Sequence, residues 1–485
     1  MGRFKRRAFP FWAILAYAAA IVAPACVWSE PEITVEDAVA LALRSNLGIR
    51  TEQLTLAGKR LTMDTAWNRF VPSLTAGVGM LRMNVAQALP AGIVPNPGSP
   101  VAGMPGFYEE VIAIPGGTLP QWGLGVTLQA QLTLSVQMFY GVRQTVLDYE
   151  AGVTSLERAR ADLERDVRKQ FYNLLLLEQS IKLQEQAIAT ATARLAETKA
   201  NYQNGLVDEY TYLSAQVSLE NLRPVLDNLT SGHEAAVMAF DQSIGLRVTA
   251  KPTLVGSIQA EVIPINAREV DLLIAKYIDG RYDLEALHQS MLQTENLISV
   301  AKAGFFPTLT LGYTLDPTFM GDPLKDPLFA DIAKDWKQVN GMFSISIGLR
   351  LDPLLPKSQT RVQLEQYRNQ LKALDLALER TRAGAEIEVR SAVRTLEKTR
   401  ATLDVKKLNA RLAQRALDLA ETGYRSGARD LLDVRSAEQD LQRAQLDVLS
   451  DQYAYVVGLL DLQSALNATV AQIKEAIHEN QTGTK

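Results

Sequence analysis

The sequence predicts an α+β membrane protein in which a trimeric β-barrel, with four strands from each protomer and twelve in all, continues into a long α-helical barrel. Three observations predict this architecture: strands that alternate between apolar and polar residues, proline-free heptad stretches long enough for very long helices, and the occurrence of both patterns twice. The duplication indicates two internal structural repeats.

The clearest strand lies at residues 122–138, WGLGVTLQAQLTLSVQM. Every even position from Trp122 to Met138 is apolar, and every odd position is small or polar. Because side chains alternate between the faces of a strand, one face is apolar and the other is polar. A soluble sandwich strand has this pattern, and so does a transmembrane barrel strand, which faces lipid on one side and a lumen on the other.

Composition excludes several classes of protein. Charged residues make up 21% of the 485 residues and the net charge is −4, whereas a nucleic-acid binder carries a basic excess. Three separated histidines and one cysteine leave no disulfide framework, and we expect no metal site and no cofactor. No nucleophile elbow or phosphate-loop motif occurs in the sequence, so we expect no enzyme.

The N-terminus has the pattern of a secretory signal peptide over residues 1–29. A basic start precedes the apolar residues 8–22, and Ala23-Pro24-Ala25 then offers small residues at the two positions that a signal peptidase reads. Cys26 follows directly and resembles the lipidated cysteine of a bacterial lipobox; the alternative is an incidental cysteine in a peptide that is removed. No later stretch reaches 18 apolar residues, so we expect no transmembrane helix in the mature chain.

The first repeat is expected over residues 30–250. Thr34 and Asp37 fit a capping box at its first helix. Its elements follow from periodicity and from proline and glycine content: a helix to about residue 67, a strand over 70–83, a loop over 84–121, the strand 122–138, a very long helix over 142–203 and a return helix over 208–244.

The second repeat is expected over residues 268–468, after an equatorial segment over 251–267. Its elements have the same order: a helix over 270–303, a strand over 305–315, a proline-containing loop, a strand over 343–351, a long helix over 358–424 and a return helix over 430–468. Gly205 and Gly427 are expected to be left-handed caps between the paired long helices. Residues 469–485 are expected to form a loosely ordered tail.

Four strands in one chain cannot close a barrel, since about eight is the practical minimum. An open sheet would leave two edges unpaired. Three copies supply twelve strands, an even number that closes, together with twelve long helical limbs that form a hollow cylinder. A secretory signal and the lack of a transmembrane helix favour the outer membrane of a two-membrane bacterium.

The chain resembles the TolC family of outer-membrane efflux proteins over roughly residues 34–468. The resemblance rests on the opening TVEDAVALALRSN, on the pair FVPSLT and FFPTLT, and on the turn motifs ANYQNGLVDEYTYLSAQ and TGYRSGARDLLDVRSAEQDL. It implies a homotrimer in outer-membrane lipid that extends into the periplasm. It also implies a passive duct that exports substrates from an inner-membrane RND, ABC or MFS pump through a periplasmic adaptor (membrane fusion) protein, in tripartite efflux or type I secretion.

The resemblance further implies a gate at the periplasmic tip and adaptor docking at the turns around Gly205 and Gly427. The gate candidates carried over from the turn motifs are Tyr424, Arg429, Asp433, Thr211 and Asp208. Two positions depart from the family: Ser436 stands where a second acidic ring is expected, and Thr211 stands where an aspartate accepts the closing bonds. The plainer interpretation is that these are ordinary solvated residues at helix ends.

A different class of function also fits long helical hairpins, namely a poreless periplasmic coiled-coil adaptor or scaffold. Such a protein should lack paired amphipathic strands beside a long loop, and this chain has them twice. A trimeric surface fibre should have one barrel segment at a terminus and not two internal ones.

Overall fold

The structure, a computed structural model, describes most of the chain and separates into two compact units. The described residues are 32–85, 88–89, 91–95, 111–114, 116–118, 122–246, 253–258, 263, 265, 267–316, 318–321, 341–351 and 355–482. The first unit comprises Met1–Gln53, Leu156–Arg281 and Ala383–Lys485, and the second comprises Leu54–Ser155 and Tyr282–Arg382. The predicted signal peptide over residues 1–29, with Cys26, lies outside the described residues.

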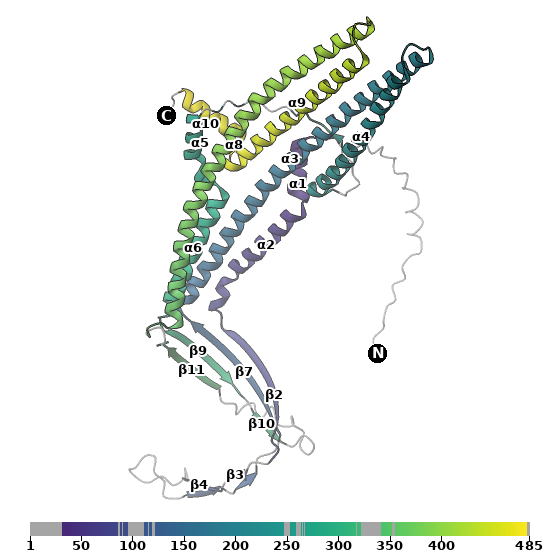
Figure 1. Cartoon of the computed structure of the whole chain (residues 1–485). Coiled ribbons are helices and arrows are strands. Elements are labelled where there is room, and N and C mark those ends of the chain that lie inside the picture. Colours follow the sequence, from purple (N-terminus) through teal and green to yellow (C-terminus); the bar gives the residue numbers. More distant parts are fainter. Residues whose placement is uncertain are drawn as a thin grey trace, which may run out of the picture. The chain divides into compact units, whose positions relative to one another are not determined.

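An antiparallel sheet dominates the second unit (Figure 1). Its four main strands lie in the order β2, β7, β9, β11, and the short β10 (Thr318–Gly321) also pairs with β7. Their bounds are Ser73–Arg82 for β2, Trp122–Leu134 for β7, Thr308–Leu315 for β9 and Gly341–Gly348 for β11. The four expected strands are therefore all present, although their ends differ by a few residues.

The register of this sheet places apolar residues in continuous rows. One row across the four strands contains Leu74, Ala130, Tyr313 and Phe343. The neighbouring row contains Ser73, Gln131, Gly312 and Ser344. Because alternate rows face opposite sides, one face of the sheet is apolar and the other is small or polar.

The strand predicted over 122–138 is shorter than expected. β7 ends at Leu134 and the helix α3 (Val136–Gln203) begins two residues later, where the Met138 N–H donates to the Ser135 carbonyl at 3.1 Å. Val136 and Met138 continue the alternation but are also compatible with helical spacing, so periodicity alone placed this boundary wrongly. Within the loop expected over 84–121, two short strand pairs form: β3 (Ala88–Leu89) with β6 (Gly117–Thr118), and β4 (Gly92–Pro95) with β5 (Val111–Ile114).

The second unit also contains a polar contact between α3 and α6 (Tyr282–Ala303). The Asn296 amide donates to the Tyr140 carbonyl and to the Gln144 side chain, both at 2.9 Å. The Gln293 amide donates to Asp148 at 3.1 Å. Directional hydrogen bonds between specific groups fix the register of these two helices more strictly than apolar contacts do.

Two helical hairpins and several shorter helices make up the first unit. The first hairpin pairs α3 with α4 (Glu209–Ile244), and the second pairs α8 (Gln359–Arg425) with α9 (Leu431–Leu466). α3 and α8 contribute to both units. A core of fully buried side chains includes Val167, Phe171 and Phe240, and the two phenylalanine rings lie 6.2 Å apart.

The first helix expected to reach residue 67 is interrupted. α1 (Val35–Ser45) begins with the predicted capping box of Thr34 and Asp37. At Asn46 the side-chain oxygen accepts the N–H of Gly48 at 2.8 Å, and this local cap starts the separate helix α2 (Leu47–Asp64). A 3₁₀ turn, η1 (Ala66–Phe70), then leads to β2.

The expectation of a loosely ordered C-terminal tail is wrong. Residues Val470–Thr482 form helix α10. Its Ile473, Ala476 and Ile477 are buried in the first unit, where α10 contacts α5 (Ala267–Tyr277). The spacing of three and four residues gives this short helix an apolar face, which explains its order.

Among the described helices, none is by itself long and apolar enough to cross a membrane. One bent pair, Leu431–Leu466 with Val470–His478, reaches that length and composition together.

Candidate functional site

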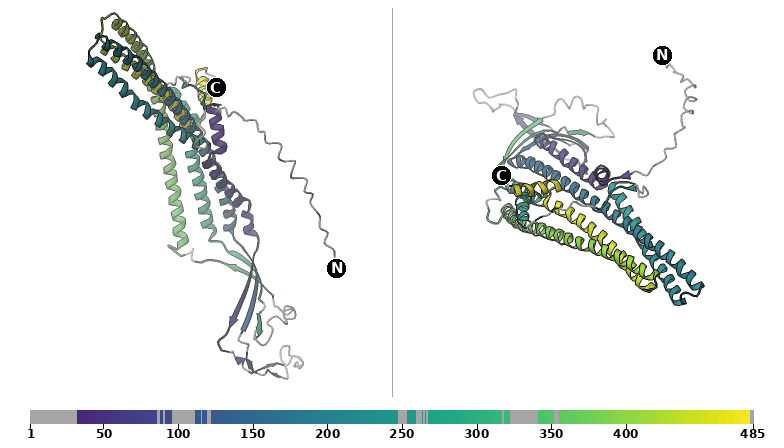
Figure 2. Two further views of the ribbon diagram at one scale, coloured as in Figure 1. Left: turned by 90° about the vertical axis from the view of Figure 1, so that its right-hand side faces the viewer. Right: turned by 90° about the horizontal axis from the view of Figure 1, so that it is seen from above.

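The turns of the two long hairpins have the same geometry and lie at the same end of the first unit (Figures 1 and 2). Gly205 has φ +72° and Gly427 has φ +74°, as predicted for left-handed caps. The Gly205 N–H donates to the Tyr202 carbonyl at 3.0 Å, and the Gly427 N–H donates to the Tyr424 carbonyl at the same distance. A side chain at either glycine would strain the backbone, so both turns need glycine.

In the second turn, Arg429 lies along its own hairpin. Its guanidinium is 3.9 Å from the Asp433 carboxylate, and both side chains are more than half exposed. Its aliphatic stem lies against Gly423, where an added Cβ would come within 3.0 Å of the Arg429 Cγ and Cδ. The Arg429–Asp433 ion pair therefore links the turn to the start of α9, and because it is exposed it contributes little to stability by itself.

In the first turn, Asp208 is the N-cap of α4. Its carboxylate accepts the Thr211 N–H at 3.0 Å and also the Thr211 hydroxyl. These two hydrogen bonds to Thr211 hold the pKa of the exposed Asp208 carboxyl below its usual range. Thr211, at the position where the family resemblance places an aspartate, is thus bound to the carboxylate three residues before it.

The tyrosines of the two turns differ in their surroundings. Tyr202 in the first turn stacks on Tyr212, with ring centroids 5.5 Å apart and planes 5° apart. Tyr424 at the equivalent place in the second turn is half-buried. Within the described part of the chain, no hydrogen bond joins Tyr424, Arg429 or Asp433 to the first hairpin.

The contacts that join the hairpins lie further along the helices. The Arg194 guanidinium, on α3, is 2.6 Å from the Glu438 carboxylate on α9 and 3.5 Å from the Glu421 carboxylate on α8. Arg194 is 15% exposed and Glu438 is 22% exposed. We call Arg194, Glu421 and Glu438 the inter-hairpin cluster.

Two more hydrogen bonds join the hairpins beside this cluster. The Arg435 guanidinium on α9 donates to the Ser214 hydroxyl on α4 at 2.6 Å. The Gln442 amide donates to the Gln184 side chain on α3, also at 2.6 Å. Directional hydrogen bonds of this kind fix the register of one hairpin against the other, whereas apolar contacts alone would let the hairpins slide past each other.

The Glu438 carboxyl interacts with the charges of Arg194, Glu421 and Arg435. Burial raises the pKa of its carboxyl, and the nearby Glu421 raises it further, while Arg194 and Arg435 oppose that shift. The direction of the shift means that desolvation outweighs the attraction of the two arginines. The carboxyl is therefore easier to protonate in this packed arrangement than in water.

Arg194 lies outside both turn motifs, and Glu438 lies inside the second motif, where nothing in the sequence points to a contact with the first hairpin. A signal for this region was nevertheless present. The core positions of α3 change from large apolar residues to polar ones towards the turn, where Ser180, Gln184 and Thr198 are all buried. Polar residues at coiled-coil core positions are typical of contacts that specify register.

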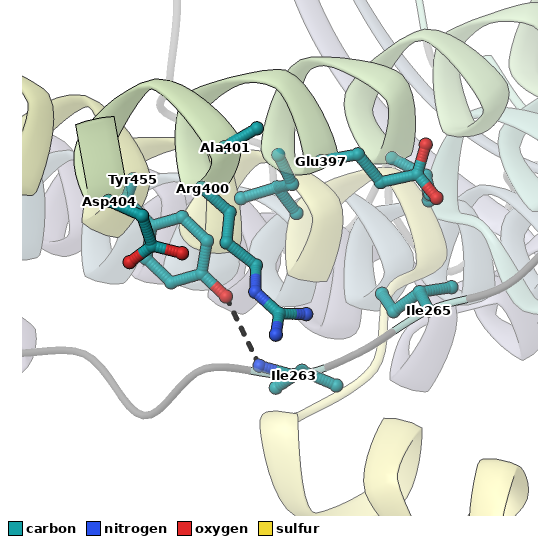
Figure 3. Close-up of a pocket in the computed structure, with 9 residues that line it drawn as sticks. Ile263, Ile265, Glu397, Arg400, Ala401, Asp404 and Tyr455 are labelled. Carbon is teal, nitrogen blue, oxygen red and sulfur yellow. Dashed lines mark hydrogen bonds between the residues drawn. The ribbon is translucent and has the colours of Figure 1, made fainter.

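A separate cleft of about 290 Å³ lies in the first unit between α8 and the segment around Ile263 (Figure 3). Val393, Leu396 and the buried ring of Tyr455 line it, and the Ile263 N–H donates to the Tyr455 hydroxyl at 3.1 Å. This hydrogen bond attaches Ile263, which lies in the segment predicted as equatorial, to helix α9 of the second hairpin. Among the described residues, no group of His, Cys, Asp or Glu is arranged to hold a metal ion.

The chain matches the family described as outer membrane efflux protein over residues 38–246 and 273–468. It is also 21% identical over 334 residues to nodulation protein T of Rhizobium leguminosarum bv. viciae. That match covers 66% of this chain and spans 64% of the length of the relative.

Solved structures have a similar fold. The Campylobacter jejuni CmeC outer membrane channel matches with a TM-score of 0.69 at 16% identity, over 93% of this chain and 90% of that one. The open state of the Neisseria gonorrhoeae MtrE outer membrane channel matches with a TM-score of 0.67 at 19% identity, over 90% and 89%. The outer membrane protein VceC of Vibrio cholerae matches with a TM-score of 0.64 at 18% identity, over 90% and 96%.

Proposed function

We propose, from the premise that this chain belongs to the outer membrane efflux protein family, that it is the outer-membrane channel of a tripartite efflux or type I secretion system. In this role three copies form a passive duct across the outer membrane and into the periplasm. Substrates reach it from an inner-membrane pump through a periplasmic adaptor, and the duct itself catalyses no reaction.

The single observation that carries this proposal is the apolar face of the sheet. Leu74 and Val78 on β2 are 81% and 74% exposed, and Ile347 on β11 is 75% exposed. The register places these residues on the same face. A continuous, exposed apolar face on a sheet whose other face is polar fits lipid on one side and a water-filled lumen on the other.

The edges of the sheet support assembly from several copies. β2 and β11 are the outer strands of the four-strand path, and every residue of both is exposed. The two edge strands run in opposite directions, so β2 of one copy can pair with β11 of the next and keep the sheet antiparallel. Three copies then close a barrel of twelve strands, whereas one chain alone cannot close.

The order of elements supports the proposed duplication. Two helices, two long strands and a long helical hairpin occur as α1, α2, β2, β7, α3 and α4, and again as α5, α6, β9, β11, α8 and α9. We therefore propose repeats over 30–250 and 268–468 joined by the segment 251–267.

The gate is proposed to lie at the hairpin end of the duct and to have two layers. The outer layer consists of the residues that the turn motifs indicate, Tyr424, Arg429 and Asp433, with Asp208 and Thr211 facing them from neighbouring hairpins in the trimer. The inner layer is the inter-hairpin cluster, whose ion pairs hold the two hairpins of one copy together. Opening requires the hairpins to separate, so each layer adds to the free energy of opening.

The two turns are the proposed contact with the adaptor, and they differ in charge. Around Gly205 the exposed residues include the apolar Leu206 and Tyr210, 72% and 78% exposed, and the acidic Asp208 and Glu209. Around Gly427 they include Arg425 and Arg429, 81% and 55% exposed, and the apolar Leu432, 69% exposed. An adaptor that meets both turns therefore needs apolar contacts at each, and its charged groups must suit acidic residues at the first turn and two arginines at the second.

Export tests the proposal directly. Deletion of the gene should sensitise the cell to the compounds exported by its pump, or abolish secretion of the passenger protein. The chain should restore export, whereas a variant with Leu74→Lys and Ile347→Lys, which charges the lipid face, should not. Restoration by a variant that cannot enter the outer membrane would contradict the duct and favour a poreless periplasmic scaffold.

A further inference from the structure

Three aromatic rings gather in the second unit where α2 leads into β2 and β7 leads into α3 (Figure 1). Trp67 and Phe70 lie in η1, which contacts β7, and Phe139 lies in the first turn of α3. The Phe70 ring centroid is 5.3 Å from that of Trp67 and 5.2 Å from that of Phe139. Trp67 is 62% exposed and Phe139 is 61% exposed. We call these three residues the rim cluster.

The rim cluster lies at one end of the apolar face of the sheet. Leu74 begins that face on β2 four residues after Phe70. Arg82 ends it beside Trp122, with the Arg82 Cζ 5.3 Å from the Trp122 ring centroid. The strand from Leu74 to Arg82 spans about 27 Å, or about 21 Å along the membrane normal at a barrel tilt of about 40°. This height is close to the apolar band of about 25 Å that barrels present to lipid, so the rim cluster is at the level of lipid head groups.

Two arginines accompany the rim cluster. Arg69 directly precedes Phe70, and Arg143 lies one helical turn after Phe139, on the same face of α3. Both residues are exposed. Within the described part of the chain, neither guanidinium has an ion pair or a hydrogen bond. Positive charge without an anionic partner therefore lies beside exposed aromatic rings.

A glycine inside α3 makes room for the Arg69 guanidinium. A Cβ added at Gly141 would overlap the Arg69 Nη1 and would lie 3.5 Å from its Cζ. Glycine in a helix interior is destabilising relative to alanine. At this position, however, any larger side chain would displace the cation. Gly141 thus allows the guanidinium to lie against α3 at the level of the rim cluster.

The proposed second repeat passes from helix to strand without this cation. The residues RFVPSLT before and within β2 correspond to GFFPTLT before and within β9. Gly304 therefore stands where the first repeat has Arg69, and Lys302 stands where it has Trp67. Because the same transition forms with other residues, the fold does not require an arginine beside an exposed tryptophan. A bound ligand gives a reason for this combination.

We propose that the rim cluster, Arg69 and Arg143 form a binding site for a glycerophospholipid. The two guanidinium groups bind its phosphate, and the three rings contact its glycerol and the first carbons of its acyl chains. Arginine pairs with phosphate through parallel N–H donors, and aromatic rings suit the boundary between head groups and acyl chains. The site rests on the proposed duct, since a lipid reaches it only if the sheet lies in a bilayer. It adds a specific lipid at the periplasmic end of the barrel.

The affinity of the purified protein for phosphatidylglycerol, measured by native mass spectrometry in detergent, tests the site. Arg69→Gln should lower this affinity about tenfold, as expected for the loss of hydrogen bonds to a charged group. The control is Arg60→Gln on α2, because the Arg60 guanidinium is already paired with Asp64 at 3.8 Å, and it should keep the parent affinity. Equal affinities of the parent chain and Arg69→Gln would overturn the site.

The variant Gly141→Ala separates lipid binding from folding. The added methyl group displaces only the flexible end of Arg69, and alanine favours the helix. The protein should therefore fold normally and lose lipid affinity as Arg69→Gln does. The matched control is Gly152→Ala, about 16 Å further along α3, where an added Cβ would come within 2.8 Å of the Lys59 Cδ. This control should bind lipid like the parent chain, and equal losses in both glycine variants would overturn the role of Arg69.

Two further probes show which part of the lipid is recognised. Inorganic phosphate at the concentration of the lipid should not compete, because it has no chains for the rings to contact. A galactosyl diacylglycerol, which has no phosphate, should bind the parent chain as weakly as it binds Arg69→Gln. Competition by inorganic phosphate would assign the site to a free anion and overturn the lipid. Tight binding of the galactolipid to both chains would overturn the role of the phosphate.

Insertion into phosphatidylglycerol vesicles distinguishes this site from the proposed duct. A protein that inserts and conducts, with the same lipid affinity in every variant, would overturn the site and leave the duct intact. A native trimer that retains no lipid would show that a neighbouring copy covers the rim cluster, and would also overturn the site alone. A protein that neither inserts nor binds lipid would overturn both proposals.

Discussion

Replacement of Arg194 by methionine tests the inter-hairpin cluster most sharply. The change removes the cation and keeps a side chain of similar length, so Glu438 and Glu421 lose their shared partner. Loss of one member of a fully buried ion pair costs about 3–5 kcal/mol, whereas an exposed pair is worth about 1 kcal/mol or less. With Arg194 15% and Glu438 22% exposed, the cost falls between these limits, at about 1.5–3 kcal/mol.

In the proposed gate this cost acts on the closed arrangement, in which the hairpins are together and the cluster is formed. Each 1.4 kcal/mol is a factor of ten, so the ratio of open to closed channels should rise about 10- to 100-fold in Arg194→Met. The assay is the open probability of single channels in a planar bilayer at pH 7 and fixed salt.

The matched control is Arg223→Met, which removes the arginine of an exposed pair with Glu220 on α4. These side chains are 61% and 54% exposed, so the change should shift the ratio by less than about threefold. The double variant with Arg194→Met and Glu438→Met should lie close to the parent chain, since an apolar pair replaces the ionic pair. An Arg194→Met channel that behaves like the Arg223→Met control, or a double variant with strictly additive losses, would refute the cluster as a latch.

Three further outcomes are expected. The pKa of Glu438 in the packed state lies above its ordinary value of 4.5, so the packed state binds the proton more tightly. The closed arrangement should therefore gain stability as pH falls towards 4.5 and lose it as pH rises through the raised pKa. Titration of the open probability should show this pH dependence in the parent chain and not in Glu438→Gln. Gly427→Ala places a side chain at φ +74° and should destabilise the turn by about 1 kcal/mol, measured by hydrogen exchange of the turn amides. The control is Gly232→Ala in the middle of α4, where a Cβ meets no other atom, and it should stabilise the helix by up to about 1 kcal/mol. Val78→Lys on the apolar face of the sheet should cost about 2–4 kcal/mol in lipid, seen as loss of folded protein in vesicles, and Thr75→Lys on the polar face should fold normally.

The sequence predicted the long elements well, because their physical signals are strong. Strict alternation identified β7, and heptads without proline identified α3 and α8 to within a few residues at the hairpin ends. Glycine at a left-handed cap is a specific local signal, and both turns have the geometry it predicts. Alternation also implies that the four strands share one apolar face, but it does not fix the register, because a shift of two residues leaves every side chain on its own face.

Boundaries and contacts at a distance were predicted less well. Val136 and Met138 satisfy both strand and helix spacing, so the sequence could not show where β7 ends. Asn46 interrupts the first helix through a hydrogen bond to its own neighbours, which no hydrophobic pattern reveals. The ion pairs of Arg194 depend on which faces of two hairpins meet, and residues 244 positions apart carry no local signal of that contact.

The single-channel conductance of the purified protein in a planar lipid bilayer distinguishes a gated duct from the alternatives, when it is measured beside the double variant Arg429→Ala with Tyr424→Ala and the variant Arg194→Met. We expect the parent chain to show a small, stable conductance that increases in both variants, with a larger increase when the two layers are removed together. A large, open conductance in the parent chain would keep the duct and remove the gate from the hairpin end. No conductance from any variant of a correctly folded trimer would contradict the duct itself.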